Sequence, residues 1–361
     1  MAEEDPEAAL ANAQKILAPK KALLVLTSTT AYPDETPTGF WLSEAAHPAV
    51  AWLDAGWTVD IASITGAAQA DPASVEDATK NSDKPSLDWL ETNKETLTST
   101  LKLADVPLED NGYDVLFFCG GFGAMWDFPD DEAVKALTKT MWEAGKIVGA
   151  VCHGPIALIN VELSDGTKLL AGKDCTGFSN AEETAMGKTD VVAKPSGPGS
   201  CEDMMGGAGV EGEGAVEGAA GGVFSAAGVF EANVAVSGNL YTGQNPPSAS
   251  PLATAILYAL DPIRAEFDPL RAVLLKEREE LAAQVEAAKK GFTTELKELK
   301  AKEAANSDKI EALQIKSIAS RDWLLGQINN MDCQIMRVAH NRQVKVSGLE
   351  KLVADAAVVE E

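Results

Sequence analysis

The sequence predicts an α/β fold with a doubly wound, mostly parallel sheet, followed by a C-terminal helical arm. Between residues 20 and 260, short apolar runs of strand length alternate with segments of helical character. Parallel strands need crossover connections, which are usually helices, so this alternation indicates a sheet covered on both faces. Beyond residue 261 the chain is rich in Glu, Lys, Ala and Leu. We therefore divide it into an acidic N-terminal tail at 1–19, an α/β domain at 20–260 and a helical or coiled-coil extension at 261–361.

The elements of the α/β domain follow from its apolar runs and their breaks. Runs of Leu, Val, Ile and Phe predict buried strands, because helices cover both faces of a parallel sheet. We expect strands at Ala22–Thr27, Thr58–Ser63, Tyr113–Cys119 and Ile147–Val151, with further strand pieces near Thr176 and at Val234–Tyr241. We expect helices at Gly39–Ala55 (with Pro48 inside), at Asp131–Ala144, after His153, and from about Ser248 to Leu260.

A glycine-rich stretch at residues 194–222 breaks this alternation. Ten of the 26 residues from Gly197 to Gly222 are glycine, and few of the others are large and apolar. Ordering such a segment costs more backbone entropy than its side chains recover by burial. We therefore predict a flexible surface loop at 194–222.

The extension after residue 261 is predicted to be helical. Apolar residues recur there at three- and four-residue steps, which marks one face of a helix: Leu274, Leu281, Val285, Ala288, Phe292, Leu296 and Leu299. Asn306-Ser307-Asp308 supplies an N-cap for a second helix, which carries Ile310, Leu313, Leu324, Ile328 and Ile335. The pattern favours a helical hairpin or short coiled coil; the alternative is a solvated helical tail.

Charge excludes two classes of partner. The 361-residue chain has a formal net charge of −25, and residues 261–361 hold 18 acidic and 16 basic side chains. Nearly all of the negative excess therefore lies in the first 260 residues, and such a surface repels nucleic acids and anionic membranes. No apolar run approaches the length of a membrane span, and the acidic N-terminus resembles neither a secretory signal nor a transit peptide.

The metal-ligating residue types are few. The three histidines make a multi-histidine zinc site improbable, and the five cysteines are scattered without metal-ligand spacing: Cys119, Cys152, Cys175, Cys201 and Cys333. An odd number of unpaired cysteines is typical of a reducing compartment, so we expect a cytoplasmic location.

The pair Cys152-His153 carries the clearest chemical signal. An apolar run, Ile147–Val151, leads directly into it, and Gly154-Pro155 then forces a change of direction. A thiol on such a strand-to-helix turn lies at the first turn of a helix, where the dipole and unpaired amides favour thiolate. The motif therefore predicts a nucleophile with a lowered thiol pKa. The alternative is a buried structural cysteine beside an incidental histidine.

Five motifs in order resemble one known superfamily. They are Thr38-Gly39-Phe40-Trp41-Leu42-Ser43-Glu44, Gly120-Gly121-Phe122-Gly123-Ala124-Met125-Trp126-Asp127, Ala150-Val151-Cys152-His153-Gly154-Pro155, Thr176-Gly177-Phe178-Ser179-Asn180-Ala181-Glu182-Glu183 and Thr242-Gly243-Gln244-Asn245-Pro246. Together they closely resemble the PfpI-like superfamily, which has the flavodoxin-like fold of class I glutamine amidotransferases. The nearest branch is the stress chaperone and glutathione-independent glyoxalase (D-lactate dehydratase) group. The resemblance runs from about Lys21 to Leu260.

The resemblance implies a set of site residues. Cys152 matches the nucleophile, and His153 is its neighbouring base. Glu44 matches a carboxylate that approaches the thiol from the first helix, and Glu183 matches the acid that orients the histidine. Glu182 takes that last role if the register slips by one residue.

The resemblance also implies a reaction that needs no cofactor and no metal. The Cys152 thiolate would add to the aldehyde carbon of methylglyoxal, Glu44 would move a proton through an enediol, and water activated by His153 would release D-lactate. The amides of Gly120 and Gly121 would face the developing oxyanion. The same thiol could oxidise, which makes a redox sensor a related possibility. The resemblance equally implies removal of sugar-like adducts from proteins (a deglycase) and a holdase chaperone role in stress.

The chain departs from the family pattern at several points. Members of this branch usually carry histidine at the position of Phe122, proline at that of Cys119, and a helix where this chain has its glycine-rich stretch. The helical extension is not part of the pattern either. A competing hypothesis is therefore a non-catalytic or redox-sensing structural subunit, which residues 262–361 assemble into a homo-oligomer or larger complex.

Overall fold

The computed structural model describes residues 6–193, 199–206, 218–301 and 307–359. The chain forms two compact units. One unit is Pro19–Leu257, and the other combines Met1–Ala18 with Tyr258–Glu361. Each unit has its own packing.

The first unit is built on a seven-stranded, mostly parallel sheet, which confirms the predicted fold class. Its strand order is β3-β2-β1-β4-β5-β9-β8, and only β8 runs antiparallel, against β9. The strands are β1 (Lys21–Leu26), β2 (Thr58–Ser63), β3 (Leu101–Lys102), β4 (Val115–Phe118), β5 (Ile147–Val151), β8 (Val234–Ser237) and β9 (Leu240–Gly243). A separate pair joins β6 (Asp174–Cys175) to β7 (Val223–Phe224).

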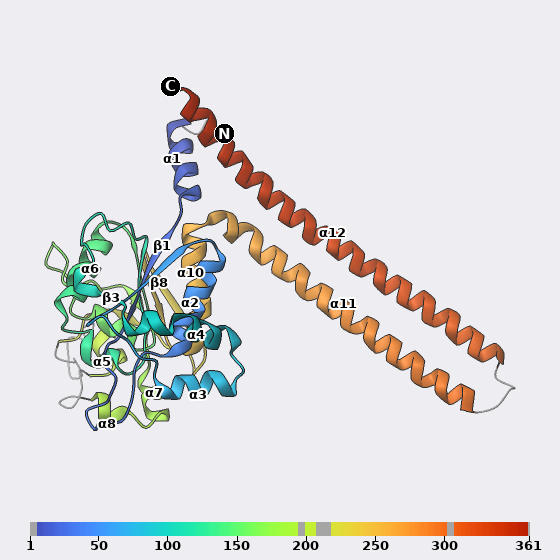
Figure 1. Cartoon of the computed structure of the whole chain (residues 1–361), viewed down its shortest axis with the longest axis horizontal. Helices are drawn as coiled ribbons and strands as arrows, with labels where there is room; N and C mark the ends of the chain where they lie inside the picture. The colour runs from blue at the N-terminus through green and yellow to red at the C-terminus, as the bar shows by residue number, and fades with distance from the viewer. Residues whose placement is uncertain (1–5, 194–198, 207–217, 302–306, 360–361) are drawn as a thin grey trace. The chain divides into compact units, whose positions relative to one another are not determined.

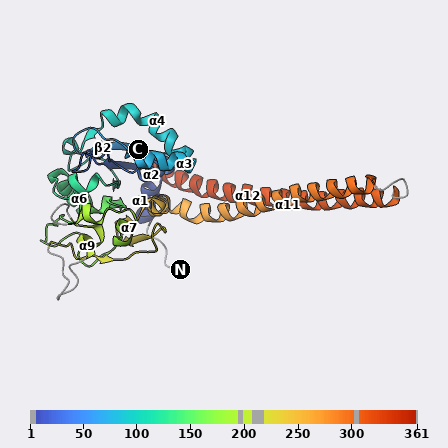
Figure 2. The same ribbon diagram turned by 90° about the horizontal axis from the view of Figure 1, so that it is seen from below.

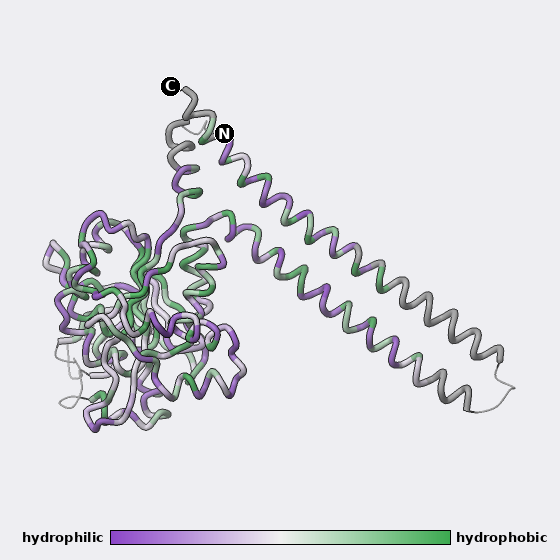
Figure 3. The backbone as a smooth tube through the Cα atoms, viewed as in Figure 1, coloured by the Kyte–Doolittle hydropathy of each residue, from purple (hydrophilic) through white to green (hydrophobic). Residues whose placement is uncertain are grey.

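The central strands of the sheet are apolar and buried on both faces. Every residue of β4 and β5 is buried, as is most of β1, and Figure 3 shows this hydrophobic interior. Helices α2 (Leu42–Asp54) and α10 (Ala249–Leu260) lie on one side of the sheet and α6 (Glu132–Glu143) on the other (Figure 1). The Trp52 indole nitrogen of α2 donates to the Ala253 carbonyl of α10 at 3.1 Å, which joins the two helices.

Two helices lie in a region where the sequence predicted no element. They are α3 (Pro72–Lys80) and α4 (Lys84–Thr98), followed by the 3₁₀ helix η1 (Leu103–Asp105). Asp71 caps α3 by accepting from the Ala73 amide, and Asp83 caps α4 by accepting from the Ser86 amide. Each helix therefore begins where an aspartate satisfies an unpaired amide.

The strand pieces predicted at Val234–Tyr241 are two strands, β8 and β9, which form a hairpin. Gly238 turns the chain with φ of 61°, a conformation that glycine adopts without steric cost. The element after His153 is a short 3₁₀ helix, η2 (Gly154–Leu158). The remaining short elements are α5 (Ala124–Asp127), α7 (Asn180–Ala185), α8 (Thr189–Val192) and η3 (Pro246–Ser248).

The prediction of a flexible surface loop at 194–222 is wrong for part of the described residues, which form a helix. Cys201–Gly206 forms helix α9, and it buries Cys201, Met204 and Met205. These three side chains supply the apolar anchor that glycine content alone did not reveal. Residues 194–198 and 207–217 lie outside the described part of the chain.

The second unit consists of long helices, which confirms the predicted helical C-terminal region. Helices α11 (Pro262–Ala301) and α12 (Ser307–Val359) run side by side in Figures 1 and 2 as an antiparallel pair. Leu274, Met331 and Val338 form their shared core, with Phe267, Leu281 and Ile335 packed against it.

The N-terminal segment belongs to this second unit. The predicted tail contains helix α1 (Pro6–Leu17), which contacts α12 within the same unit. Asn306 of the predicted N-cap lies outside the described residues, as do the side chains of Leu296 and Leu299. None of the helices that the structure describes is long and apolar enough to span a bilayer.

Candidate active site

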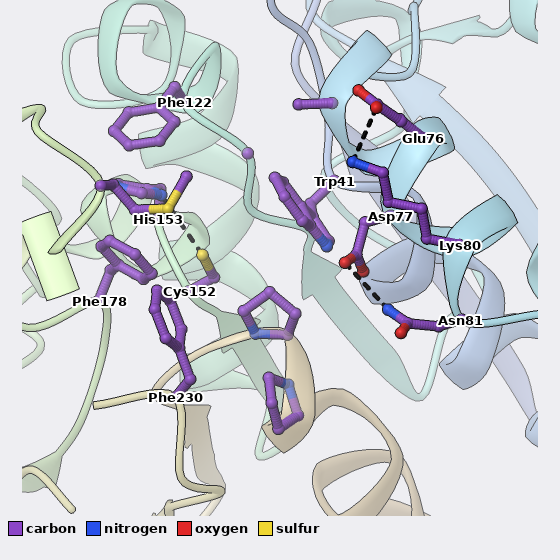
Figure 4. A pocket seen from close by; sticks show the side chains of 15 residues that line it. Trp41, Glu76, Asp77, Lys80, Asn81, Phe122, Cys152, His153, Phe178 and Phe230 are labelled. Carbon is purple, nitrogen blue, oxygen red and sulfur yellow. Dashed lines mark hydrogen bonds and ion pairs between the residues drawn. The ribbon is translucent and has the colours of Figure 1, made fainter. Parts of the chain in front are cut away.

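A cavity of about 520 Å³ opens at the carboxyl ends of the central strands. Cys152 follows β5 directly, and Gly121 follows β4 by a short turn. Ligands of open α/β sheets bind at this edge, because the loops after neighbouring parallel strands converge there. Figure 4 shows the Cys152 thiol between an aromatic wall and the polar face of α3.

Cys152 lies on a strained turn between β5 and η2. Its φ is 61°, in the left-handed region that non-glycine residues rarely adopt, at a cost of roughly 1–2 kcal/mol. The turn is fixed because the Cys152 amide donates to the Gly243 carbonyl at 2.8 Å. A β-carbon on Gly154 would lie 2.3 Å from the Phe118 carbonyl oxygen, so glycine is required there. This geometry is that of a nucleophile elbow.

Three buried side chains form a hydrogen-bonded chain. The Cys152 sulfur lies 3.3 Å from His153 Nδ1, and His153 Nε2 lies 2.9 Å from Glu183 Oε1. The imidazole and the carboxyl are each 1% exposed. With Glu183 Oε1 as the acceptor, Nε2 carries the hydrogen and Nδ1 presents its lone pair to the thiol. Glu183, not Glu182, is therefore the acid in contact with the histidine.

Two phenylalanines hold the His153 ring between them. The Phe122 ring centroid lies 4.2 Å from that of His153 with planes tilted by 39°, and the Phe178 centroid lies at 4.5 Å with a tilt of 34°. Phe122, at a position where the resembling branch usually has histidine, thus packs on the base and leaves no second imidazole there. The imidazole can move little between the two rings.

Glu44 approaches the thiol from α2 and is fully buried. Burial raises its pKa well above the ordinary value, while hydrogen bonding to the Cys152 side chain and the Gly120 amide opposes that rise. Neither carboxyl oxygen has a partner of ordinary hydrogen-bond geometry among the described residues. Burial thus favours the neutral form of Glu44 in the folded protein.

The predicted lowering of the Cys152 pKa is wrong. Burial raises the pKa of this thiol well above its ordinary value, the Glu44 carboxyl adds to the rise, and the Gly121 amide only partly opposes it. The dipole of a five-residue 3₁₀ helix is too weak to offset removal of a thiolate from water. The resting nucleophile is therefore a thiol, and its proton must leave during the reaction.

The two glycines after β4 have different neighbours. The Gly121 amide faces the Cys152 sulfur, whereas the Gly120 amide faces the Glu44 carboxyl. A β-carbon on Gly120 would lie 2.5 Å from Glu44 Oε2, and one on Gly121 would lie 2.3 Å from the Gly39 carbonyl oxygen. Neither position accommodates another residue, because Glu44 and Cys152 lie too close to Gly120 and the backbone of residues 39–41 lies too close to Gly121.

A model of the DJ-1/PfpI family matches residues 36–259. The chain belongs to the DJ-1/PfpI family. It is 30% identical over 251 residues to a protein of Saccharomyces cerevisiae named glutathione-independent glyoxalase HSP31, covering 68% of this chain and 99% of that one. It is 34% identical over 178 residues to Glyoxalase 3 of Candida albicans, covering 48% of this chain and 75% of that one.

Solved structures of similar proteins agree with the fold. The Rapid Encystment Protein 24 kDa of Francisella tularensis superposes with a TM-score of 0.58 at 34% identity, over 67% of this chain and 99% of that one. Glyoxalase III of Candida albicans superposes with a TM-score of 0.55 at 29% identity, over 66% of this chain and 97% of that one. Both similarities cover about two thirds of the chain.

Glu182 builds the wall of the site in this DJ-1/PfpI protein. Its Oε2 accepts from the Ser179 amide and hydroxyl, and its Oε1 accepts from the Phe230 amide at 2.9 Å and the Asn245 amide nitrogen at 2.8 Å. One buried carboxylate thus ties three segments of the cavity together. The spacing Ser179-x-x-Glu182 is a capping box, a signal that could have identified Glu182 as structural.

Cys119 stabilises the turn of α2 that carries Glu44. Pro48 has no amide hydrogen, so the Glu44 carbonyl four residues earlier in α2 loses its helical partner. The Cys119 thiol donates to that carbonyl at 3.6 Å. Cysteine in place of the family's usual proline therefore supplies a donor for the helix turn that carries Glu44.

The other thiols differ from what the sequence suggested. Cys201 falls within the predicted flexible surface loop at 194–222, but it is 0% exposed and its sulfur lies 3.9 Å from the His153 carbonyl oxygen. Cys175 is buried, and Cys333 on α12 is exposed. Among the described residues, no group of three or more His, Cys, Asp or Glu side chains is placed to hold a metal ion.

Proposed function

We propose that this protein is a glutathione-independent glyoxalase, a cofactor-independent lyase that converts methylglyoxal to D-lactate. The observation that carries the proposal is the chain Cys152–His153–Glu183 beside the buried carboxyl of Glu44. It provides a nucleophile, a base and a neutral acid around one atom. Relatives with glyoxalase names support the same assignment.

The first step joins the thiol to the aldehyde. As the Cys152 sulfur bonds to the aldehyde carbon, its proton moves to His153 Nδ1, which lies 3.3 Å away. The carbonyl oxygen gains negative charge near the Gly121 amide and takes the proton of Glu44. The products are a hemithioacetal, an imidazolium and a Glu44 carboxylate.

The second step moves hydrogen between the two carbons. The carboxylate of Glu44, whose raised pKa makes it a strong base, removes the proton from the sulfur-bearing carbon while the His153 imidazolium protonates the ketone oxygen. The resulting enediol takes the Glu44 proton at the neighbouring carbon and returns its hydroxyl proton to His153. A lactoyl thioester on Cys152 remains.

Hydrolysis restores the resting site. Water attacks the thioester carbon and gives a proton to the Glu44 carboxylate, while the His153 imidazolium protonates the departing sulfur. One methylglyoxal and one water therefore give one lactic acid, with no external oxidant or reductant. Glu44 and the Cys152 thiol both return to their neutral forms.

Amino-acid composition supports a dicarbonyl substrate. The first arginine in the chain is Arg264, so the unit that contains the site has none. Guanidinium groups condense readily with 2-oxoaldehydes, whereas the other side chains react more slowly. A protein that concentrates such a substrate benefits from an arginine-free surface.

The test is D-lactate formation by the purified chain in the absence of glutathione. Cys152→Ala and Glu44→Gln should each abolish turnover, whereas Cys175→Ala, which alters a buried thiol outside the cavity, should not. In D₂O, solvent deuterium on the carbinol carbon of lactate would show that the hydrogen passes through an exchangeable carrier, whereas its absence would mean that Glu44 returns the substrate hydrogen before it exchanges. Activity in Cys152→Ala would exclude the thiol mechanism.

We further propose a cytoplasmic location, because the free cysteines fit a reducing compartment. We propose that the helical arm, residues 262–361, assembles the chain into a homo-oligomer or larger complex. Leu270, Val273, Met336 and Val344 are exposed on α11 and α12, and exposed apolar side chains of this kind favour association. Light scattering on the wild type and on Val273→Glu/Met336→Glu should show a smaller particle for the double variant.

A further inference from the structure

The cavity above Cys152 is larger than methylglyoxal requires. Its volume of about 520 Å³ is typical of sites that bury a drug-sized ligand. Methylglyoxal has only a methyl group beyond its two carbonyl carbons, and these carbons must lie beside the thiol. Most of the cavity would then contribute no contact to the substrate, and unfilled space forfeits dispersion energy.

The wall that leads from the nucleophile to the mouth is aromatic. The rings of Phe122, His153, Phe178 and Phe230 follow one another along it in Figure 4. Their neighbouring centroids are separated by 4.2, 4.5 and 6.2 Å. Aromatic rings favour offset or edge-to-face contact with a further ring, so this wall suits an aromatic substituent on the ketone carbon.

The opposite wall carries no charge that would select an anion. Lys80 is the one lysine or arginine among the described residues that line the cavity, and its Nζ pairs with Glu76 at 2.7 Å. Asn81 donates to Asp77 at 3.0 Å on the same helix face. A phosphate or carboxylate substituent would find only paired or acidic groups there, so a neutral substituent is favoured.

Phe230 is held at the cavity mouth against its conformational preference. Its side chain is 42% exposed, and its φ is 56°. Both features are unfavourable for a large apolar residue. The backbone stays in place because the Phe230 amide donates to the buried Glu182 carboxylate at 2.9 Å. The loop therefore presents an aromatic ring where the outer part of a substrate would lie.

We propose that the preferred substrate is a 2-oxoaldehyde with an aromatic or large apolar substituent, and that Phe230 determines this selectivity. The inference rests on the proposed glyoxalase function. Phenylglyoxal and water would give mandelate by the same proton transfers, with the aldehyde carbon oxidised to the carboxyl level and the ketone carbon reduced to the alcohol.

The test compares kcat/KM for phenylglyoxal and methylglyoxal. The wild type should prefer phenylglyoxal, and Phe230→Ala should lower the ratio of the two values about tenfold, a loss of about 1.4 kcal/mol in selectivity. Phe230→Leu should be intermediate, because it keeps apolar bulk without the ring. Val229→Ala is the matched control, since Val229 is 45% exposed and does not line the cavity; its ratio should equal that of the wild type.

A wild-type preference for methylglyoxal, or a ratio that Phe230→Ala leaves unchanged, would overturn the inference while the glyoxalase function stands. Absence of turnover with both substrates would instead overturn the proposed function. Calorimetric binding of mandelate and lactate to the Cys152→Ala protein then tests the cavity without turnover. Mandelate should bind at least tenfold more tightly, and equal affinities would refute the aromatic preference.

Discussion

Replacing Glu44 with glutamine should raise stability and abolish activity. The carboxyl is completely buried, and burial raises its pKa well above the ordinary value of 4.5. A group with a raised pKa in the folded state contributes stability that is fully present below the unfolded pKa and lost as pH rises through the folded pKa. Glutamine copies the neutral carboxyl at every pH, so Glu44→Gln avoids this loss.

The magnitude follows from the surroundings of the carboxyl. An ionised Glu44 would have only the Cys152 thiol and the Gly120 amide as donors, and leaving a buried polar group poorly satisfied costs about 1–3 kcal/mol. We expect Glu44→Gln to gain about that much stability at pH 8, with roughly 2–4 °C in Tm for each kcal/mol. At pH 4 the variant and the wild type should unfold at nearly the same temperature.

The assay is thermal unfolding of both proteins between pH 4 and pH 8, with lactate formation measured beside it. Asp127, whose pKa burial raises to about 6, also weakens the fold as pH rises, but its effect is common to both proteins and cancels. Loss of the proton carrier should lower kcat by about 10²- to 10⁴-fold. A variant that is less stable than the wild type at pH 8 would refute the raised pKa of Glu44.

Three further predictions test the nucleophile and its surroundings. Glu183→Gln should lower kcat by about 10²-fold or more without loss of folded protein, because an amide can reverse the His153 tautomer and remove the free Nδ1 lone pair; kinetics and circular dichroism measure both. Iodoacetamide at pH 7 should label the exposed Cys333 before the buried Cys152, as peptide mapping with mass spectrometry would show. Lys80→Arg should lose activity progressively during turnover and gain dicarbonyl adducts at the substituted position, whereas the wild type should do neither.

The strands of the sheet could be predicted because their information is local. Ile147–Val151 has the predicted bounds, since a central parallel strand must be apolar on both faces. Thr58–Ser63 also has the predicted bounds, although only its last three residues are buried. Helices α3 and α4 were not predicted because they contain few apolar residues. Their aspartate caps, each followed by a proline in the first helical turn, were the available signal.

The errors arose where tertiary contacts override local composition. The glycine content of 194–222 predicts a loop, but Cys201 and Met205 bury against the site and hold a helix there. The order of the site motifs along the chain predicted which residues meet in the site. Phe230 and Lys80 also line the cavity, but nothing in the local sequence around them indicates this. Long-range packing of this kind cannot be derived from periodicity.

The pKa of the Cys152 thiol differs between the local prediction and the folded chain, and this difference affects the mechanism. Local sequence places Cys152 at a helix start beside a histidine, which favours thiolate; the folded chain buries the thiol and raises its pKa. A stored thiolate would react with any electrophile that reaches it. A neutral thiol, 3.3 Å from His153 Nδ1, becomes nucleophilic only when a carbonyl carbon is positioned to receive it. Slow alkylation of Cys152 together with rapid dicarbonyl turnover is therefore the expected combination, and fast alkylation would indicate that the proton has already left the sulfur in the resting enzyme.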